Sequence, residues 1–165
     1  MISSKIAKAS YYRNFVFGVE DSLVSTVGLL SGITIAGVDS KTVLATGVIL
    51  IFVEAISMGA GSFLSESSAE TYENHVEKPT NRSYLDALIM FISYLLSGCI
   101  PLLPYIIFSQ DIAFWGSVIV SLLVLFVLGV INAKISGTRV WKSVMRMVLI
   151  GGSAIAIGSI IGRLF

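Results

Sequence analysis

Apolar residues form five long runs along this chain, and short polar segments separate them. The runs occupy residues 15–38, 43–65, 84–108, 112–133 and 144–164. A helix needs about 20 consecutive, mostly apolar residues to cross a bilayer, and every run meets that length. The pattern therefore predicts an all-α integral membrane protein, a single membrane domain with five transmembrane helices.

The composition agrees with a bilayer as the surrounding solvent. Hydrophobic residues make up 55% of the 165 residues and charged residues only 13%, whereas soluble domains average about 25% charged residues. A net charge of +1 without a basic tract argues against a nucleic-acid partner. No nucleophile–base pair, zinc-ligand cluster or phosphate-binding glycine loop is visible, so we do not expect an enzyme.

Lysine and arginine residues gather on one side of the predicted bundle. Of the 11 such residues, only Lys41 and Arg163 fall on the other side. Short loops rich in these residues face the cytoplasm, so we expect the N-terminus there and the C-terminus on the opposite side. An odd number of spans requires the same result.

Two acidic residues and one methionine fall inside the first two predicted helices. At a rise of 1.5 Å per residue, Glu54 lies about 15 Å below the cytoplasmic surface, near the bilayer midplane. Met58 lies about 10 Å and Asp21 about 9 Å below that surface, which places these two residues level. A charged carboxylate at the midplane costs at least about 2.5 kcal/mol. Such a carboxylate should therefore face a cavity or a counter-ion, or carry a proton.

Small residues share a helix face with each buried acid. In the first predicted helix, Ser25, Gly28 and Gly32 follow Asp21 at helical spacing, and a similar stripe surrounds Glu54 in the second. Small residues let another helix approach closely in a membrane. Each helix therefore presents a narrow face that contains its acid and admits a neighbouring backbone.

Each of these residues also has a structural explanation. Met58 is compatible with core packing, and Glu54 with a protonated side chain that is hydrogen-bonded to a serine of another helix. Asp21 lies close enough to the surface to pair with Arg13 or Asn14. The three residues together favour an ion path, since two acids and a thioether lie on small-residue faces.

The ligand types indicate which ion would use such a path. Carboxylates alone suit magnesium or calcium, but a thioether adds a soft donor that favours first-row transition metals such as Fe²⁺ or Mn²⁺. A buried carboxylate can also exchange a bound cation for a proton. The predicted metal residues are Asp21, Glu54 and Met58, and the transported species are a divalent metal and protons, without a tightly bound cofactor.

A short acidic segment, residues 66–83, is predicted to continue the second helix into the cytoplasm. Its acids recur at a spacing of four, three and four residues and form one face: Glu66, Glu70, Glu73 and Glu77. Pro79 ends the predicted helix. The face is either a solvated surface or an electrostatic funnel that collects divalent cations, so these four acids are further candidate metal ligands.

Four segments resemble the vacuolar iron transporter family, in the same order along the chain. They are RNFVFGVEDSLVSTVGLLSGI (13–33), EAISMGAGSFLS (54–65), PLLPY (101–105) and LGVINAKISG (128–137). The resemblance implies a homodimer through the first helix, at Ser25, Gly28 and Gly32, with an ion path between the two copies. It also implies export of Fe²⁺ or Mn²⁺ from the cytoplasm in exchange for protons, across the plasma membrane of a prokaryote or a vacuole-like membrane. The family's membrane aspartate and methionine correspond to Asp21 and Met58.

Three features depart from the family pattern. Ser62 stands where the family carries a carboxylate near the cytoplasmic mouth, and Glu54 is a candidate to compensate for it. Ser22 replaces the usual glycine after the aspartate. The segment 66–83 is short, where the family commonly inserts a cytoplasmic metal-binding domain. The alternative function is a non-transporting membrane scaffold or subunit that binds partner helices through its small-residue faces.

Overall fold

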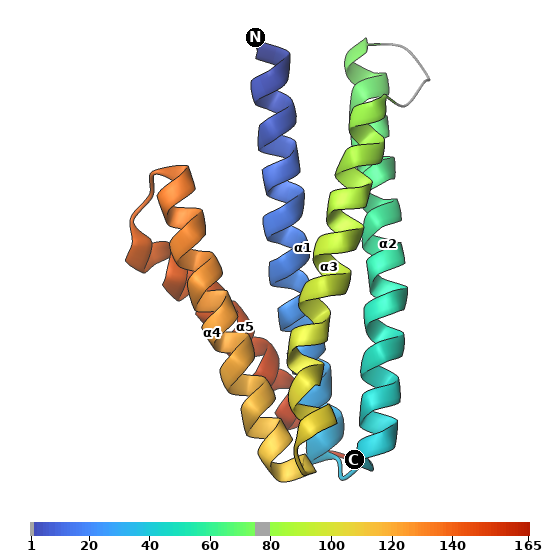
Figure 1. Ribbon diagram of the computed structural model, residues 1–165, viewed down its shortest axis with the longest axis vertical. Helices are drawn as coiled ribbons and strands as arrows, with labels where there is room; N and C mark the ends of the chain where they lie inside the picture. Colours follow the sequence, from blue (N-terminus) through green and yellow to red (C-terminus); the bar gives the residue numbers. More distant parts are fainter. Residues whose placement is uncertain (1, 75–79) are drawn as a thin grey trace.

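The computed structural model describes residues 2–74 and 80–165, and the side chains of residues 7–72 and 80–165. The described residues form five helices, α1 (Ile2–Ile35), α2 (Ser40–Asn74), α3 (Asn81–Ile107), α4 (Gln110–Ser136) and α5 (Val140–Gly162) (Figure 1). Each contains a stretch long and apolar enough to cross a membrane. The prediction of an all-α protein with five such helices is therefore confirmed.

α1 extends further than its apolar run suggested, because it begins at Ile2 rather than near residue 15. α2 runs without interruption to Asn74, into the acidic segment that was predicted to continue it. Ser10 and Asn14 are buried on one side of the first part of α1, so this segment packs against the bundle although its composition is polar. Glu77 lies outside the described residues, as does the side chain of Glu73.

Short turns make neighbouring helices antiparallel. Gly37 and Gly137 adopt φ angles of 79° and 65° in the α1–α2 and α4–α5 turns, a left-handed conformation that glycine adopts without strain. α1 ends at Ile35 and α2 begins at Ser40. A residue of α1 and a residue of α2 therefore lie at similar levels along the bundle when their residue numbers add up to about 75. The hydrogen bond from Ser62 Oγ to Asn14 Oδ1, 3.0 Å long, fits this register.

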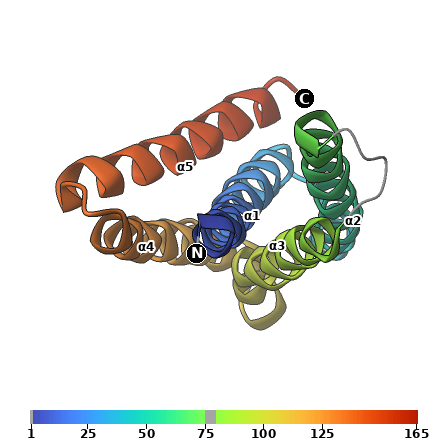
Figure 2. The same cartoon turned by 90° about the horizontal axis from the view of Figure 1, so that it is seen from above.

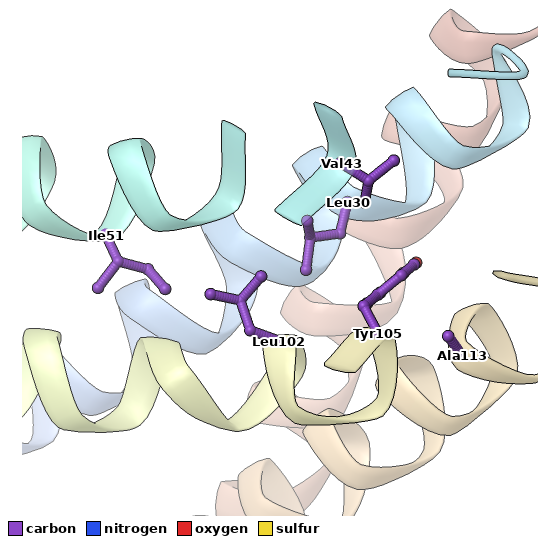
Figure 3. Packing of buried hydrophobic residues seen from close by; sticks show 6 residues of the cluster. All are labelled: Leu30, Val43, Ile51, Leu102, Tyr105 and Ala113. Carbon is purple, nitrogen blue, oxygen red and sulfur yellow. The ribbon is translucent and has the colours of Figure 1, made fainter. Parts of the chain in front are cut away.

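α1 lies at the centre of the bundle, with the other four helices around it (Figure 2). It contributes to two hydrophobic clusters. One lies near the α1–α2 turn and packs Leu30 with residues of α2, α3 and α4, namely Val43, Ile51, Leu102, Tyr105 and Ala113 (Figure 3). The other packs Leu23 against Leu125, Leu128 and Met147 of α4 and α5. These clusters fix the position of α1 between the two halves of the molecule.

The small-residue stripe of α1 packs against α5. A Cβ atom on Gly158 would overlap the carbonyl oxygen of Gly28, and one on Gly162 would overlap that of Gly32. The glycines therefore bring the two backbones of one chain into contact. This differs from the expectation that Gly28 and Gly32 meet a second copy, and a homodimer through α1 stays a prediction.

Candidate functional site

Asp21 of α1 and Glu54 of α2 lie close enough to interact electrostatically. Both side chains are half-buried, and their numbers add up to 75, so the α1–α2 turn places them at the same level. Two carboxylates that share a partly buried site repel each other unless a cation or a proton lies between them. The pair is therefore a candidate centre for a cation or proton site.

Met58 occupies a different level from Asp21. It lines a hollow of about 450 Å³ together with Phe17, Asn14 and Ser62, which lie nearer the N-terminal end of α1. The depth estimate that placed Met58 level with Asp21 is wrong by about one helical turn. It was made for each helix separately, whereas the turn at residues 36–39 sets the register between the two helices.

Tyr94 of α3 adjoins the acid pair and was missed by the sequence analysis. Its side chain is completely buried, its hydroxyl lies 2.7 Å from Ser25 Oγ, and it interacts electrostatically with both Asp21 and Glu54. A buried tyrosine hydroxyl requires a polar partner. A tyrosine inside an apolar run was the only signal in the sequence, and it does not reveal which helix the hydroxyl faces.

Ser22, which departs from the family pattern, has a structural role beside this pair. Its hydroxyl donates a hydrogen bond of 2.7 Å to the carbonyl oxygen of Tyr94. The close contact is possible because residue 98 is glycine, since a Cβ atom there would lie 2.6 Å from Ser22 Oγ. The serine therefore fixes α1 against α3 next to Asp21 without changing the acid itself.

Asp21 also borders a groove between α1 and α5. The groove has a volume of about 710 Å³ and is lined mainly by small and apolar residues, among them Gly32, Ile157 and Ile161. Ser25 lies one turn from Asp21 on the same wall. The carboxylate is therefore adjacent to open space and is not sealed among packed side chains.

A second polar cluster lies toward the end of the bundle where α1 begins, and we call it the polar network. It is formed by residues of α1, α2 and α3 and by Thr80 before α3: Ser10, Arg13, Asn14, Ser62, Glu66, Glu70, Thr80, Arg82, Ser83 and Asp86. Most of these side chains are buried, and together they join the three helices.

Glu66 is turned into this network. Its carboxylate forms ion pairs with Arg13 and, at 3.4 Å, with Arg82, and it accepts a hydrogen bond of 3.1 Å from Ser10 Oγ. Glu66 lies one helical turn beyond Ser62, on the same buried face of α2. It therefore supplies a carboxylate close to the position where the family pattern led us to expect one.

Glu70 is buried as well. It accepts hydrogen bonds from the backbone nitrogen of Thr80 at 3.2 Å, from Thr80 Oγ1 at 2.5 Å and from Ser83 Oγ at 2.7 Å. The carboxylate thus ties α2 to the first turn of α3. Glu66 and Glu70 accordingly do not belong to a solvated acidic face, because both point inward. Whether either binds a metal stays a prediction.

Asp86 is the acid that the sequence analysis missed. It is completely buried and accepts hydrogen bonds from Asn14 Nδ2 at 2.6 Å and from Ser10 Oγ at 3.0 Å. Arg82 Nε lies 3.8 Å from it. In the sequence, Asp86 precedes an uninterrupted apolar run. That pattern is equally typical of an exposed acid at the end of a membrane helix, so it did not indicate a buried carboxylate.

Within the described side chains, neither acid cluster forms a complete metal cage. Among the described side chains, no group of three or more His, Cys, Asp or Glu residues is placed to hold a metal ion. A cation at Asp21 and Glu54 would need further ligands such as hydroxyl groups, water or a second copy.

Comparisons with known proteins agree with this architecture. The chain matches the VIT family over residues 12–86 and 73–163. It is 24% identical to vacuolar iron transporter 1 of Arabidopsis thaliana, with 87% of this chain and 82% of the relative covered. It is 28% identical to vacuolar iron transporter homolog 4 of the same plant, with 91% and 81% covered. Vacuolar iron transporter 1 of Oryza sativa subsp. japonica is 26% identical, with 87% and 81% covered. The matched segments include all five helices, and the chain belongs to the VIT family.

Proposed function

We propose that this protein is a membrane transporter that exports Fe²⁺ or Mn²⁺ from the cytoplasm in exchange for protons. The observation that carries the proposal is the pair of carboxylates, Asp21 and Glu54, held within electrostatic range inside the membrane-spanning helices. An acid inside a membrane helix is costly, so two such acids within electrostatic range of each other support a cation or proton route. The relatives named vacuolar iron transporter support iron as one cargo.

Met58 and the neighbouring hydroxyl groups complete the proposed route. Met58 lines the hollow that lies nearer the polar network, one turn from Glu54, so a cation passes the thioether before it reaches the acid pair. A thioether favours Fe²⁺ or Mn²⁺ over magnesium and calcium. When the cation leaves, a proton on Asp21 or Glu54 relieves the repulsion between the carboxylates, and this couples the two flows.

The direction of export follows from the proposed orientation. Lysine and arginine residues lie mainly at the end of the bundle that holds the polar network, and this bias favours a cytoplasmic location for that end. The relatives are named for a vacuolar location, and we propose a vacuole-like membrane or a prokaryotic plasma membrane for this chain.

We further propose a homodimer through the open side of α1. Gly28 and Gly32 contact α5, so a second copy would meet the groove beside Asp21, Ser25 and Leu29. A thiol crosslinker applied to a Leu29→Cys, Cys99→Ser variant should join two copies. Absence of a crosslinked dimer in membranes would contradict this contact.

Uptake by proteoliposomes tests the proposed function. Wild-type protein should accumulate Fe²⁺ or Mn²⁺ well above protein-free liposomes, and Asp21→Asn or Glu54→Gln should reduce the initial rate at least about tenfold, since a lost charge contact of about 1.4 kcal/mol already gives that factor. Met58→Leu keeps a similar side-chain volume but removes the sulfur. It should reduce the uptake rate less than Asp21→Asn or Glu54→Gln does. Asp111→Asn, an exposed acid in the first turn of α4, is the matched control.

The same experiment separates transport from the scaffold alternative. If wild-type protein moves neither metal, the transporter proposal fails and the scaffold function is favoured. If Asp21→Asn and Glu54→Gln transport as fast as Asp111→Asn, the protein is a transporter but the assigned route is wrong. The helical content of each variant by circular dichroism and its elution volume in size-exclusion chromatography should match the wild type. This control distinguishes loss of the fold from loss of the site.

A further inference from the structure

The charges at the end of the bundle where α1 begins are divided unequally between its two halves. Arg13 and Arg82 lie in the α1–α3 half and form ion pairs with Glu66 and Asp86. In the α4–α5 half, the chain after Asp111 contains no acidic residue, although it carries five cationic ones. The cations of this half therefore have no anionic partner in their own sequence segment.

Three of these cations lie around the α4–α5 turn. Lys134 is in the last turn of α4, Arg139 precedes α5 and Lys142 lies in its first turn, and all three side chains are exposed. We call them the basic turn. Within the described side chains, none of the three forms an ion pair or a side-chain hydrogen bond. Arg146 is left out of this group because it interacts electrostatically with Glu20.

The basic turn is placed at the edge of the apolar part of the protein. Figure 1 shows the α4–α5 turn in the half of the molecule that contains the N-terminus, below the tips of α1, α2 and α3, on a hairpin that leans away from α2 and α3. Trp141, between Arg139 and Lys142, is 71% exposed, and Ile135 is 61% exposed. Exposed tryptophan next to lysine and arginine is typical of the level of lipid headgroups.

We propose that the basic turn binds the headgroup of an anionic phospholipid in the adjoining leaflet. Lys134, Arg139 and Lys142 supply positive charge to the lipid phosphate, and Trp141 and Ile135 provide apolar contacts for the upper part of the acyl chains. The backbone N–H groups of the first turn of α5 add to the positive potential, since this turn contains no acidic residue. A neutral phospholipid lacks the net charge that this arrangement selects.

Native mass spectrometry of the purified full chain tests the proposal. Delipidated protein is incubated with equal amounts of phosphatidylglycerol and phosphatidylcholine, and the retained lipids are counted. Wild type should prefer phosphatidylglycerol. The combined variant Lys134→Gln, Arg139→Gln, Lys142→Gln should lower that preference at least about fivefold, because each cation near an anionic surface contributes about 1 kcal/mol.

Arg163→Gln provides a matched control, since it removes an exposed cation after the end of α5, near the opposite end of the molecule. It should leave the preference unchanged. The proposal is overturned if wild type shows no preference for phosphatidylglycerol, if the combined variant retains it as well as wild type, or if Arg163→Gln reduces it equally. The single variants Arg139→Gln and Lys142→Gln serve if the combined one does not fold. Lipid retention does not depend on metal flux, so either proposal can fail alone.

Discussion

Asp86 shows how much of the polar network depends on single residues. Its carboxylate is completely buried and has donors from both α1 residues, Ser10 and Asn14, while Arg82 of its own helix lies 3.8 Å away. A buried charge is tolerated only when it is hydrogen-bonded and paired. The position of α3 relative to α1 at this end therefore depends on that carboxylate.

Asp86→Asn should destabilise the protein without abolishing the fold. The amide has nearly the same volume but cannot accept both hydrogen bonds in the same way, and it leaves Arg82 with less compensation. We expect the free energy of unfolding in mixed micelles to fall by about 2–3 kcal/mol, the range for lost hydrogen bonds to a charged group. Asp111→Asn, on the exposed surface of α4, should change it little. Equal stability of both variants would show that Asp86 is not a structural centre.

Asp39 gives a pH dependence whose sign follows from its hydrogen bonds. Its carboxylate accepts bonds from Thr42 Oγ1 at 2.6 Å, from the Thr42 nitrogen at 3.2 Å and from the Lys41 nitrogen at 3.1 Å, at the start of α2. These bonds from Thr42 and Lys41 lower the pKa of Asp39 below its usual value of 3.8. The ionised form is therefore favoured in the folded protein, and its contribution to stability is present above pH 3.8 and lost as the pH falls through the lowered pKa.

Comparison of wild type with Asp39→Asn tests this sign. The stability difference between the two should be constant near neutral pH and should shrink as the pH is lowered below about 4, where the carboxylate becomes protonated. Thermal unfolding in detergent between pH 6 and pH 3 measures it. A difference that grows on acidification would contradict the assignment.

At the residue scale, the sequence revealed acids but not their partners. Asp21 and Glu54 could be chosen because a charge inside an apolar run is costly wherever the run packs. Tyr94 and Asp86 could not be chosen in this way, because their importance depends on hydrogen bonds to α1 that only the packing creates. For Glu66, the spacing of acids along α2 identified an acidic face of the helix. In the structure, Glu66 and Glu70 on that face are buried against the rest of the bundle.

At the scale of helices, the short α1–α2 turn determines which residues meet. It brings Asp21 level with Glu54 and Asn14 level with Ser62. This register was not obtained from the sequence, because the predicted apolar runs, 15–38 and 43–65, place the turn a few residues after its observed position between Ile35 and Ser40. The partner of the Gly28 and Gly32 stripe was not available, because small residues permit close approach equally to α5 and to a second copy.

Gly158→Ala should destabilise the α1–α5 contact. The added methyl group would overlap the carbonyl oxygen of Gly28, a backbone atom that cannot move aside without shifting a helix. We expect a loss of about 1–3 kcal/mol, as for overpacking in a core, seen as a lower unfolding temperature in detergent. Gly152→Ala is the control on the same helix, because nothing lies within 4 Å of its Cβ position. Similar effects of the two changes would contradict the proposed close packing.

At the scale of the whole molecule, two halves differ in polarity. α1, α2 and α3 enclose the acid pair and the polar network, whereas α4 and α5 form a hairpin that has no acidic residue after Asp111 and leans away from α2 and α3 (Figure 1). The candidate route follows the side of α1 that faces α2, and the groove beside α5 opens next to Asp21. The polar network lies at the end where we propose that the metal enters.

Simultaneous recording of metal and proton movement in one population of proteoliposomes tests the central claim most directly. Liposomes contain a metal-sensitive dye and a pH indicator, and Mn²⁺ is added outside. We predict that metal entry is accompanied by proton exit, that an acidic interior accelerates it, and that Asp21→Asn and Glu54→Gln each abolish both signals while Asp111→Asn retains them. Metal entry no faster than in protein-free liposomes, or entry that is unaffected by both substitutions, would contradict an ion route through the Asp21–Glu54 pair.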